Sequence, residues 1–418
     1  MHSAGALTPQ HERENLGRAV AVVVIGIACA EFFLQPLALL LVVCLFAVIS
    51  PTKDFKWLFL LSACILITLL NIPKELDDDL TNYVALQDYI SAKPFFVLFN
   101  KDELRQISGT YRVTEMGFYG PLWFLSQVIP DSRADIAIVA TVGIYIPAFL
   151  GLTIIGKTEK WSNGLILMVA CFTFFAGLNF VQSTHLIRQY ISGSLLFLAF
   201  ALYLCNRRGW AILVFLYACA AHNGTAPLVP TVGAACWLFR YRPGRRFGFS
   251  GMLVRLFGML VVIAAMIAAV PILQGDFFKE GDVPNIHIGH YIAVGTLFLI
   301  AHTAIQRLHL HLKSLYYARI AFVAVYVLSL GFFALGLRLF ALRYFAYLEL
   351  LYGLMVGAIM FNLFNGRPRL QAIARLTVAI AAAGILITRI TLSEFSYGAG
   401  DNYFLSWNFF EVMQSFSR

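Results

Sequence analysis

Residues 134–155 read ADIAIVATVGIYIPAFLGLTII and are almost entirely apolar. As a helix, a stretch of this length crosses the hydrocarbon core of a bilayer, which is roughly 30 Å thick. A helix also satisfies its backbone hydrogen bonds within the segment, as a lipid environment requires. This stretch therefore predicts a transmembrane helix.

Apolar runs recur on both sides of this stretch, from residue 17 to residue 390. Of the 418 residues, 60% are hydrophobic and only 13% are charged, whereas soluble domains carry about a quarter charged residues. The mean hydropathy is +0.77. We therefore expect an all-α, polytopic integral membrane protein that forms a single transmembrane domain over residues 1–418. About thirteen spans are predicted, at 17–33, 35–50, 55–72, 134–155, 161–181, 189–205, 209–222, 225–239, 256–274, 288–305, 316–336, 341–362 and 370–390.

The basic residues follow the loops in a regular way. A net charge of +9 would suggest nucleic acid as a partner in a soluble protein. Here alternate loops are basic, which the positive-inside rule explains without any partner. We expect a cytoplasmic N-terminus and no nucleic-acid partner. The predicted cytoplasmic loops contain Lys53/Lys56, Lys157/Lys160, Arg207/Arg208, Arg240/Arg242/Arg245/Arg246, Arg307/Lys313 and Arg367/Arg369/Arg375.

The N-terminal sequence argues against a cleaved signal peptide, and the cysteine positions argue against disulfides and a zinc site. Ala28-Cys29-Ala30 resembles a signal-peptide cleavage site, but apolar sequence resumes at once, which favours an uncleaved first span. The seven cysteines all lie within or at the ends of apolar runs, with no CxxC or Cys/His ligand spacing. They are typical of small buried apolar side chains. We expect no disulfide, no structural zinc and no bound cofactor.

The longest polar segment, 73–133, is predicted to be an outer, periplasmic loop. Residues 83–99 mix aromatic and charged residues, as a helix lying on the membrane would. Residues 116–128 are apolar but too short for a full crossing, so we expect a re-entrant or interfacial segment. The basic loop that follows residue 239 is expected on the cytoplasmic side, which requires the chain to cross twice within 209–239. We therefore predict two short helices that meet at residues 222–225, where a glycine favours a break.

Ionisable side chains near the ends of spans are the candidates for function, because they cost several kcal/mol in a membrane unless paired or hydrated. Arg188 begins a span that runs inward, and His222 ends the span that returns outward. Arg338 and Arg343 bracket the start of another inward span, and Glu349 follows Arg343 by six residues. In the predicted topology these groups all lie in the outer half of the membrane.

Each candidate also has a structural interpretation. Arginines at a membrane boundary snorkel to lipid headgroups, and His222 can simply cap a helix end. The three aspartates at 77–79 can cap a helix, and they leave a divalent-metal requirement open. A purely structural role is hardest to assign to Glu349, because a carboxylate two turns into a span needs a partner, for which Arg343 or Arg338 is near enough in sequence.

Three stretches resemble one family. Residues 183–194 read STHLIRQYISGS and residues 220–226 read AAHNGTA. This resembles the EpsG family of Wzy-like exopolysaccharide and O-antigen polymerases, in which an Arg-Gln pair opens one span and a His followed by small residues closes the next. Residues 342–345, LRYF, are similar to the Arg-aromatic-aromatic opening of a late span in that family. The acidic, tyrosine-rich segment from 78 to 115 is similar to its first outer loop.

The resemblance implies a glycosyltransferase-C-like enzyme of the bacterial inner membrane whose active site faces the periplasm. It would join oligosaccharide repeat units carried on undecaprenyl pyrophosphate, with membrane lipids and a chain-length regulator protein as further partners. Arginines suit the pyrophosphate, and a histidine suits the general base. The implied catalytic residues are His222, Asp78, Asp79 and Glu349; the pyrophosphate residues are Arg188, Gln189, Arg338 and Arg343; the glycan residues are Tyr83, Tyr89, Glu115, Trp123 and Tyr344.

Two other classes of membrane protein share some of these features. A flippase for lipid-linked oligosaccharides would also need cations for pyrophosphate, but spread through the depth of a cavity. The short segments within 209–239 are compatible with the broken helices of transporters. A membrane acyltransferase that modifies surface glycans would use an intramembrane histidine, with an acidic partner on the cytoplasmic side.

Overall fold

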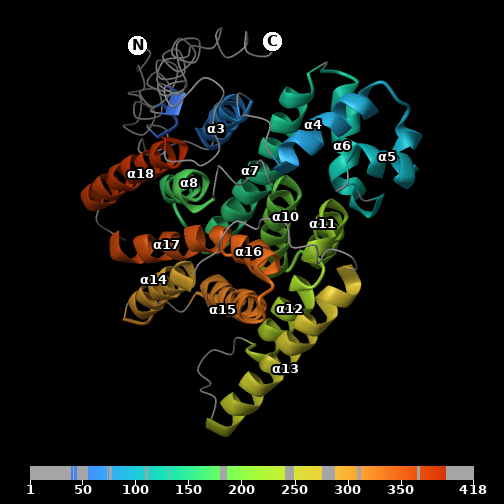
Figure 1. Cartoon of the computed structure of the whole chain (residues 1–418). Coiled ribbons are helices and arrows are strands. Elements are labelled where there is room, and N and C mark those ends of the chain that lie inside the picture. Colours follow the sequence, from blue (N-terminus) through green and yellow to red (C-terminus); the bar gives the residue numbers. More distant parts are fainter. Residues whose placement is uncertain are drawn as a thin grey trace, which may run out of the picture.

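The structure, a computed structural model, describes most of the chain. The described residues are 39–40, 42–44, 55–72, 74, 78–108, 111, 113–129, 131–178, 186–240, 249–274, 288–307, 312–364 and 368–391. Within them the protein is all-helical and has no strand, as predicted (Figure 1). The predicted spans 17–33 and 35–50 lie almost entirely outside these residues.

Six of the described helices are long and apolar enough to cross a membrane. These segments are Ser132–Thr158, Ile187–Leu204, Ser250–Ala269, Lys313–Ala334, Phe340–Gly357 and Arg369–Ile390. Other predicted spans are shorter apolar helices of 10–17 residues, at Lys56–Asn71, Asn163–Gly177, Arg208–Ala221 and Tyr291–Gln306. The polytopic helical class is thus supported by this set.

The elements follow one another as helices joined by short connections. Several coincide closely with predicted spans, because a long apolar run has only one way to satisfy its backbone in lipid. In order they are α3 (Phe55–Asn71), α4 (Asp78–Ser91), η1 (Phe95–Phe99), α5 (Lys101–Ile107), η2 (Val113–Glu115), α6 (Met116–Ser126), α7 (Ser132–Thr158), α8 (Asn163–Phe172), the π-helical η3 (Thr173–Gly177), α10 (Ile187–Leu204), α11 (Arg208–Ala221), η4 (Asn223–Thr225), α12 (Leu228–Leu238), α13 (Phe249–Gln274), α14 (Ile288–Arg307), α15 (Lys313–Ala334), α16 (Arg338–Ala346), α17 (Glu349–Phe364) and α18 (Pro368–Thr391).

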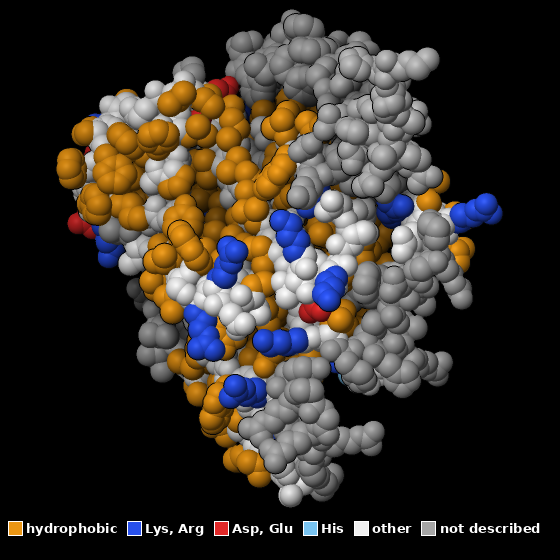
Figure 2. Space-filling model, turned by 180° about the vertical axis from the view of Figure 1, so that it is seen from behind, with side chains coloured by type: hydrophobic (Ala, Val, Ile, Leu, Met, Phe, Trp, Pro, Cys, Tyr) orange, Lys and Arg blue, Asp and Glu red, His pale blue; other side chains and the backbone are white. Residues whose placement is uncertain are grey.

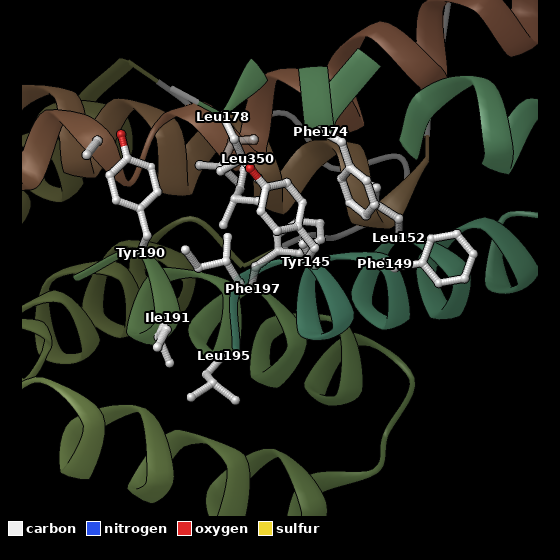
Figure 3. Close-up of a cluster of buried hydrophobic side chains, with 14 of the residues drawn as sticks. Tyr145, Phe149, Leu152, Phe174, Leu178, Tyr190, Ile191, Leu195, Phe197 and Leu350 are labelled. Atoms are coloured by element: carbon white, nitrogen blue, oxygen red, sulfur yellow. The ribbon is translucent and has the colours of Figure 1, made fainter. Parts of the chain in front are cut away.

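Helices α7 and α10 form the centre of the bundle. Helix α7 packs against α10 and α3, α10 also packs against α11, and α8 contacts α17 and α18. Between α7, the α8–η3 segment, α10 and α17, aromatic side chains such as Tyr145, Phe149 and Phe174 form a buried cluster (Figure 3). Glycines allow the close approach: a Cβ at Gly143 of α7 would lie 2.8 Å from the side chain of Ile191 on α10. Such small residues are typical of helix packing in membranes.

Side-chain contacts join the ends of several helices. At ends predicted to be cytoplasmic, the Thr158 hydroxyl lies 2.8 Å from the Cys205 thiol, and the Ser314 amide donates to Glu159 at 3.1 Å. At ends predicted to be on the outer side, Arg389 donates to the backbone carbonyl of Leu178 at 2.6 Å. Lys and Arg side chains also gather on the face seen in Figure 2, among hydrophobic surface.

One predicted segment is interrupted in the structure, and a second is partly buried. The predicted span 341–362 is interrupted at Tyr347 and Leu348, which separate α16 from α17. Glu349 therefore begins α17, although the apolar segment Phe340–Gly357 as a whole is long enough to cross a membrane. The segment 83–99, expected on the membrane surface, includes most of α4, whose apolar residues Leu86 and Ile90 are buried where α4 packs against α6 and α7. The predicted break at 222–225 is confirmed.

A substitution at Gly353 tests the packing of α17 against η3. A Cβ there would overlap the hydroxyl of Thr173, whose position is fixed by its bond to the Val169 carbonyl. We expect Gly353→Ala to lower the free energy of unfolding by about 1–3 kcal/mol, as overpacking does. Gly384→Ala is the matched control, because nothing lies within 4 Å of that Cβ position. Unfolding midpoints in one detergent would measure both, and equal midpoints would contradict the close contact.

Candidate functional site

The site is built around the carboxylate of Glu115, at the junction of η2 and α6. Its side chain is 1% exposed. It accepts hydrogen bonds from the Arg188 guanidinium, from Nδ1 of His222 at 2.9 Å and from the backbone amide of Asn223 at 3.2 Å. Burial alone would raise the pKa of Glu115, but Arg188 and His222 lower it to about 2. The carboxylate is therefore ionised and joins the η2–α6 junction to α10 and to the α11–η4 junction.

Arg188 lies in the first turn of α10 and is 8% exposed. Besides the ion pair with Glu115, its Nε donates to the Tyr83 hydroxyl at 3.0 Å and its Nη1 donates to the Tyr119 hydroxyl at 3.1 Å. The guanidinium carbon also lies 5.5 Å from the centre of the Tyr83 ring. A buried guanidinium with these partners orients its neighbours, which is the structural role that the geometry supports for Arg188.

His222 follows the last residue of α11, where the chain turns into η4. Since an ionised carboxylate only accepts hydrogen bonds, Nδ1 of His222 must carry the proton that Glu115 receives. Burial lowers the pKa of His222, and the positive charges of Arg188 and Arg343 lower it further, although Glu115 acts in the opposite direction. A neutral ring protonated on Nδ1 leaves Nε2 with a free lone pair. This is the form that a general base requires.

A small pocket lies beside His222. Its cavity volume is only about 10 Å³, and it is lined by His222, Gly224, Phe340, Arg343, Tyr344 and Tyr347. A Cβ at Gly224 would come within 2.6 Å of Nε2, so only glycine leaves room beside the imidazole. The Tyr344 hydroxyl donates to the Gly224 carbonyl at 3.0 Å and holds α16 against this turn. An imidazole with a lone pair and a guanidinium thus share one pocket.

Gln189 joins this pocket to the first turn of α10. Its side-chain amide donates to the backbone carbonyl of Arg343. The residue therefore positions α16 through the main chain. The predicted pair Arg188 and Gln189 is thus divided in the structure, one side chain reaching Glu115 and the other reaching Arg343.

Most of the predicted site residues come together here, although not all in the predicted way. Arg188, His222, Glu115, Tyr83, Gln189, Arg343 and Tyr344 form one connected group. Tyr83 is 1% exposed and held by Arg188, so its ring is not open to a sugar. Glu115, expected to bind the glycan, is instead the buried centre.

Other predicted residues lie elsewhere. Tyr89 donates to Glu103, and the indole nitrogen of Trp123 donates to the Lys93 carbonyl at 2.8 Å. Glu349 accepts a hydrogen bond from the Tyr190 hydroxyl at 3.3 Å, and Arg338 is exposed at the first residue of α16. Helix α4 begins at Asp78, and the side chains of Asp78 and Asp79 lie outside the described residues.

Three contributors were not predicted from the sequence. Tyr119 binds Arg188, the Asn223 amide binds Glu115, and Tyr347 lines the pocket. In a sequence with many aromatic residues, nothing distinguishes one tyrosine as a site residue. A backbone amide cannot be identified from the sequence at all. Among the described residues, no group of three or more His, Cys, Asp or Glu side chains is arranged to hold a metal ion.

No protein-family model, no curated protein and no solved structure matches this chain. The resemblance to the EpsG family therefore rests on the quoted motif residues alone. The geometry of the site has to support any function without a relative as a guide.

Proposed function

We propose that this chain is a membrane-embedded glycosyltransferase that joins oligosaccharide units carried on a polyprenyl pyrophosphate, in the manner of a Wzy-type polymerase. One observation carries the proposal: His222, held by the ionised Glu115, lines the same pocket as Arg343. Glycosyl transfer from such a donor needs both a proton acceptor and a fixed cation. The proposed setting is the bacterial inner membrane with about thirteen spans, a cytoplasmic N-terminus and the pocket on the periplasmic side.

The chemistry assigns one role to each side of the pocket. Nε2 of His222 accepts the proton of the acceptor hydroxyl as that oxygen attacks the anomeric carbon. The bond from this carbon to the pyrophosphate oxygen breaks, and the leaving group departs with its electron pair. Arg343 stabilises the negative charge that develops on this leaving group, and fixed charges of this kind are usually the largest catalytic contribution.

Arg188 and Gln189 act through other residues in this proposal. Arg188 keeps Glu115 ionised, and Glu115 sets the tautomer of His222. Gln189 holds the main chain at Arg343. Both are positioning residues, which differs from the direct contact with pyrophosphate that the motif resemblance implies.

The test is reconstitution of the full chain in vesicles with a synthetic lipid-linked repeat unit. We expect the wild type to produce a ladder of longer glycans. Arg343→Ala should lower the elongation rate by at least about a hundredfold, the scale seen when a stabilising donor is removed from a transition state. Arg369→Ala, an exposed arginine at the start of α18, serves as the charge-matched control and should elongate normally.

Two outcomes would reject the proposal. Movement of the substrate across the vesicle membrane without lengthening would assign the chain to transport. Acyl transfer from an added acyl donor to the glycan, again without lengthening, would assign it to surface-glycan acylation. Normal elongation by Arg343→Ala would reject the assignment of Arg343 while leaving the reaction class in place.

A further inference from the structure

A second hollow lies away from the Glu115 site, at the junction of α10 and α11. It is an open surface hollow of about 510 Å³, lined by Asn206, Arg207, Arg208, Gly209, Trp210 and Leu213. The turn is tight, since Asn206 adopts a left-handed backbone with φ of 61°. This conformation brings two consecutive arginines to the rim of one hollow, independently of the proposed glycosyl transfer.

The charge of this hollow is wholly positive. No carboxylate lines it. Arg207 and Arg208 are exposed, and neither forms an ion pair with any side chain in the described part of the chain. Helix α11 starts here with Arg207 as its N-cap, and no side chain caps it. The positive end of the helix dipole therefore adds to the two guanidinium groups.

An exposed apolar strip continues from the arginines along α11. Trp210, Leu213 and Tyr217 follow at helical spacings of three and four, so they share one face. These three residues are 64%, 57% and 44% exposed. A free phosphate ion would leave this apolar strip without contacts. A phospholipid has both parts in the same order, an anionic headgroup followed by acyl chains.

We infer that the α10–α11 hollow binds an anionic phospholipid, with its phosphate on Arg207 and Arg208 and an acyl chain along Trp210, Leu213 and Tyr217. Guanidinium groups bind phosphate through forked hydrogen bonds. Tryptophan at a membrane boundary places its ring at headgroup level. Basic pockets between membrane helices are known to hold anionic headgroups. The site would thus anchor this end of α11 at one membrane surface.

The experiment measures lipid retention by the purified full chain, using native mass spectrometry during titration with phosphatidylglycerol. Arg207→Ala/Arg208→Ala should weaken binding about 25-fold, because each basic residue near an anionic surface contributes about a factor of five. Trp210→Ala/Leu213→Ala should weaken it several-fold through the acyl chain. The control Lys157→Ala/Arg240→Ala removes the same charge at exposed sites outside the hollow and should bind as the wild type does.

Three results would overturn the inference. One is unchanged binding by the arginine variant, and another is an equal loss in the control variant, which would indicate a general charge effect. The third is unchanged binding by the Trp210→Ala/Leu213→Ala variant, which would show that the acyl chain does not contact this strip. Unfolding midpoints of the variants in detergent separate lost binding from lost folding.

Discussion

Replacing Glu115 with leucine should lower the free energy of unfolding by about 3–5 kcal/mol, the range for breaking one half of a buried ion pair. The guanidinium of Arg188 would stay buried without its carboxylate. His222 and the Asn223 amide would lose their acceptor as well. Reversible unfolding in mixed detergent micelles would measure the change. Asp102→Leu, at an exposed position of α5, is the matched control and should change stability by about 0.5 kcal/mol or less.

The double variant Glu115→Leu/Arg188→Leu decides whether the pair itself is responsible. Removing both charges leaves no uncompensated ion, so the double variant should be more stable than Glu115→Leu alone. Two independent, additive losses would contradict the buried pair.

The pKa of Glu115 is about 2 in the folded chain, below the usual value of about 4.3. Its contribution is therefore complete above about pH 4.3 and lost as the pH falls towards 2.

The sequence indicates part of this site because charged residues are rare in spans and expensive there. Arg188 and His222 stand out for this reason, and the structure brings them to one carboxylate. Which carboxylate this is could not be predicted. The segment 73–133 contains many acidic residues, and only the packing of α6 against α11 selects Glu115. Tyr83 likewise looks like a sugar-stacking residue until its hydroxyl is seen on Arg188.

In the fold, too, local sequence predicts some features, and contacts between distant segments determine others. Apolar length predicts where helices lie, and the glycine at 224 marks the break between α11 and α12. The interruption between α16 and α17 has no such mark, since neither Tyr347 nor Leu348 is a helix breaker. There the Tyr347 hydroxyl lies 3.3 Å from that of Ser192 on α10, and the Tyr347 ring lies against Gly193. The break is therefore associated with contacts between distant segments, which apolar periodicity does not contain.

His222→Ala should reduce the rate of glycan elongation by about 10²–10⁴-fold, the usual contribution of a positioned general base. The wild-type rate should also depend on pH in a defined direction. Only the neutral imidazole accepts a proton, so activity should rise as His222 deprotonates and then remain level. Burial lowers the pKa of His222 below its usual 6.5. The pH at which the rate is half-maximal should therefore be below 6.5. Elongation assays between pH 4.5 and 8 would measure this profile.

Glu115→Gln separates a base from a structural histidine. The hydrogen bond and the charge of Glu115 both raise the pKa of His222, so removing that charge should move the half-maximal rate to a still lower pH. The maximal rate should fall too, because glutamine no longer imposes the proton on Nδ1. A histidine that only capped α11 would leave the pH profile of His222→Ala identical to the wild type. That result, in a variant that still folds, would exclude His222 as the general base. A general base is the role that predicts loss of the pH-dependent rise in rate when His222 is removed.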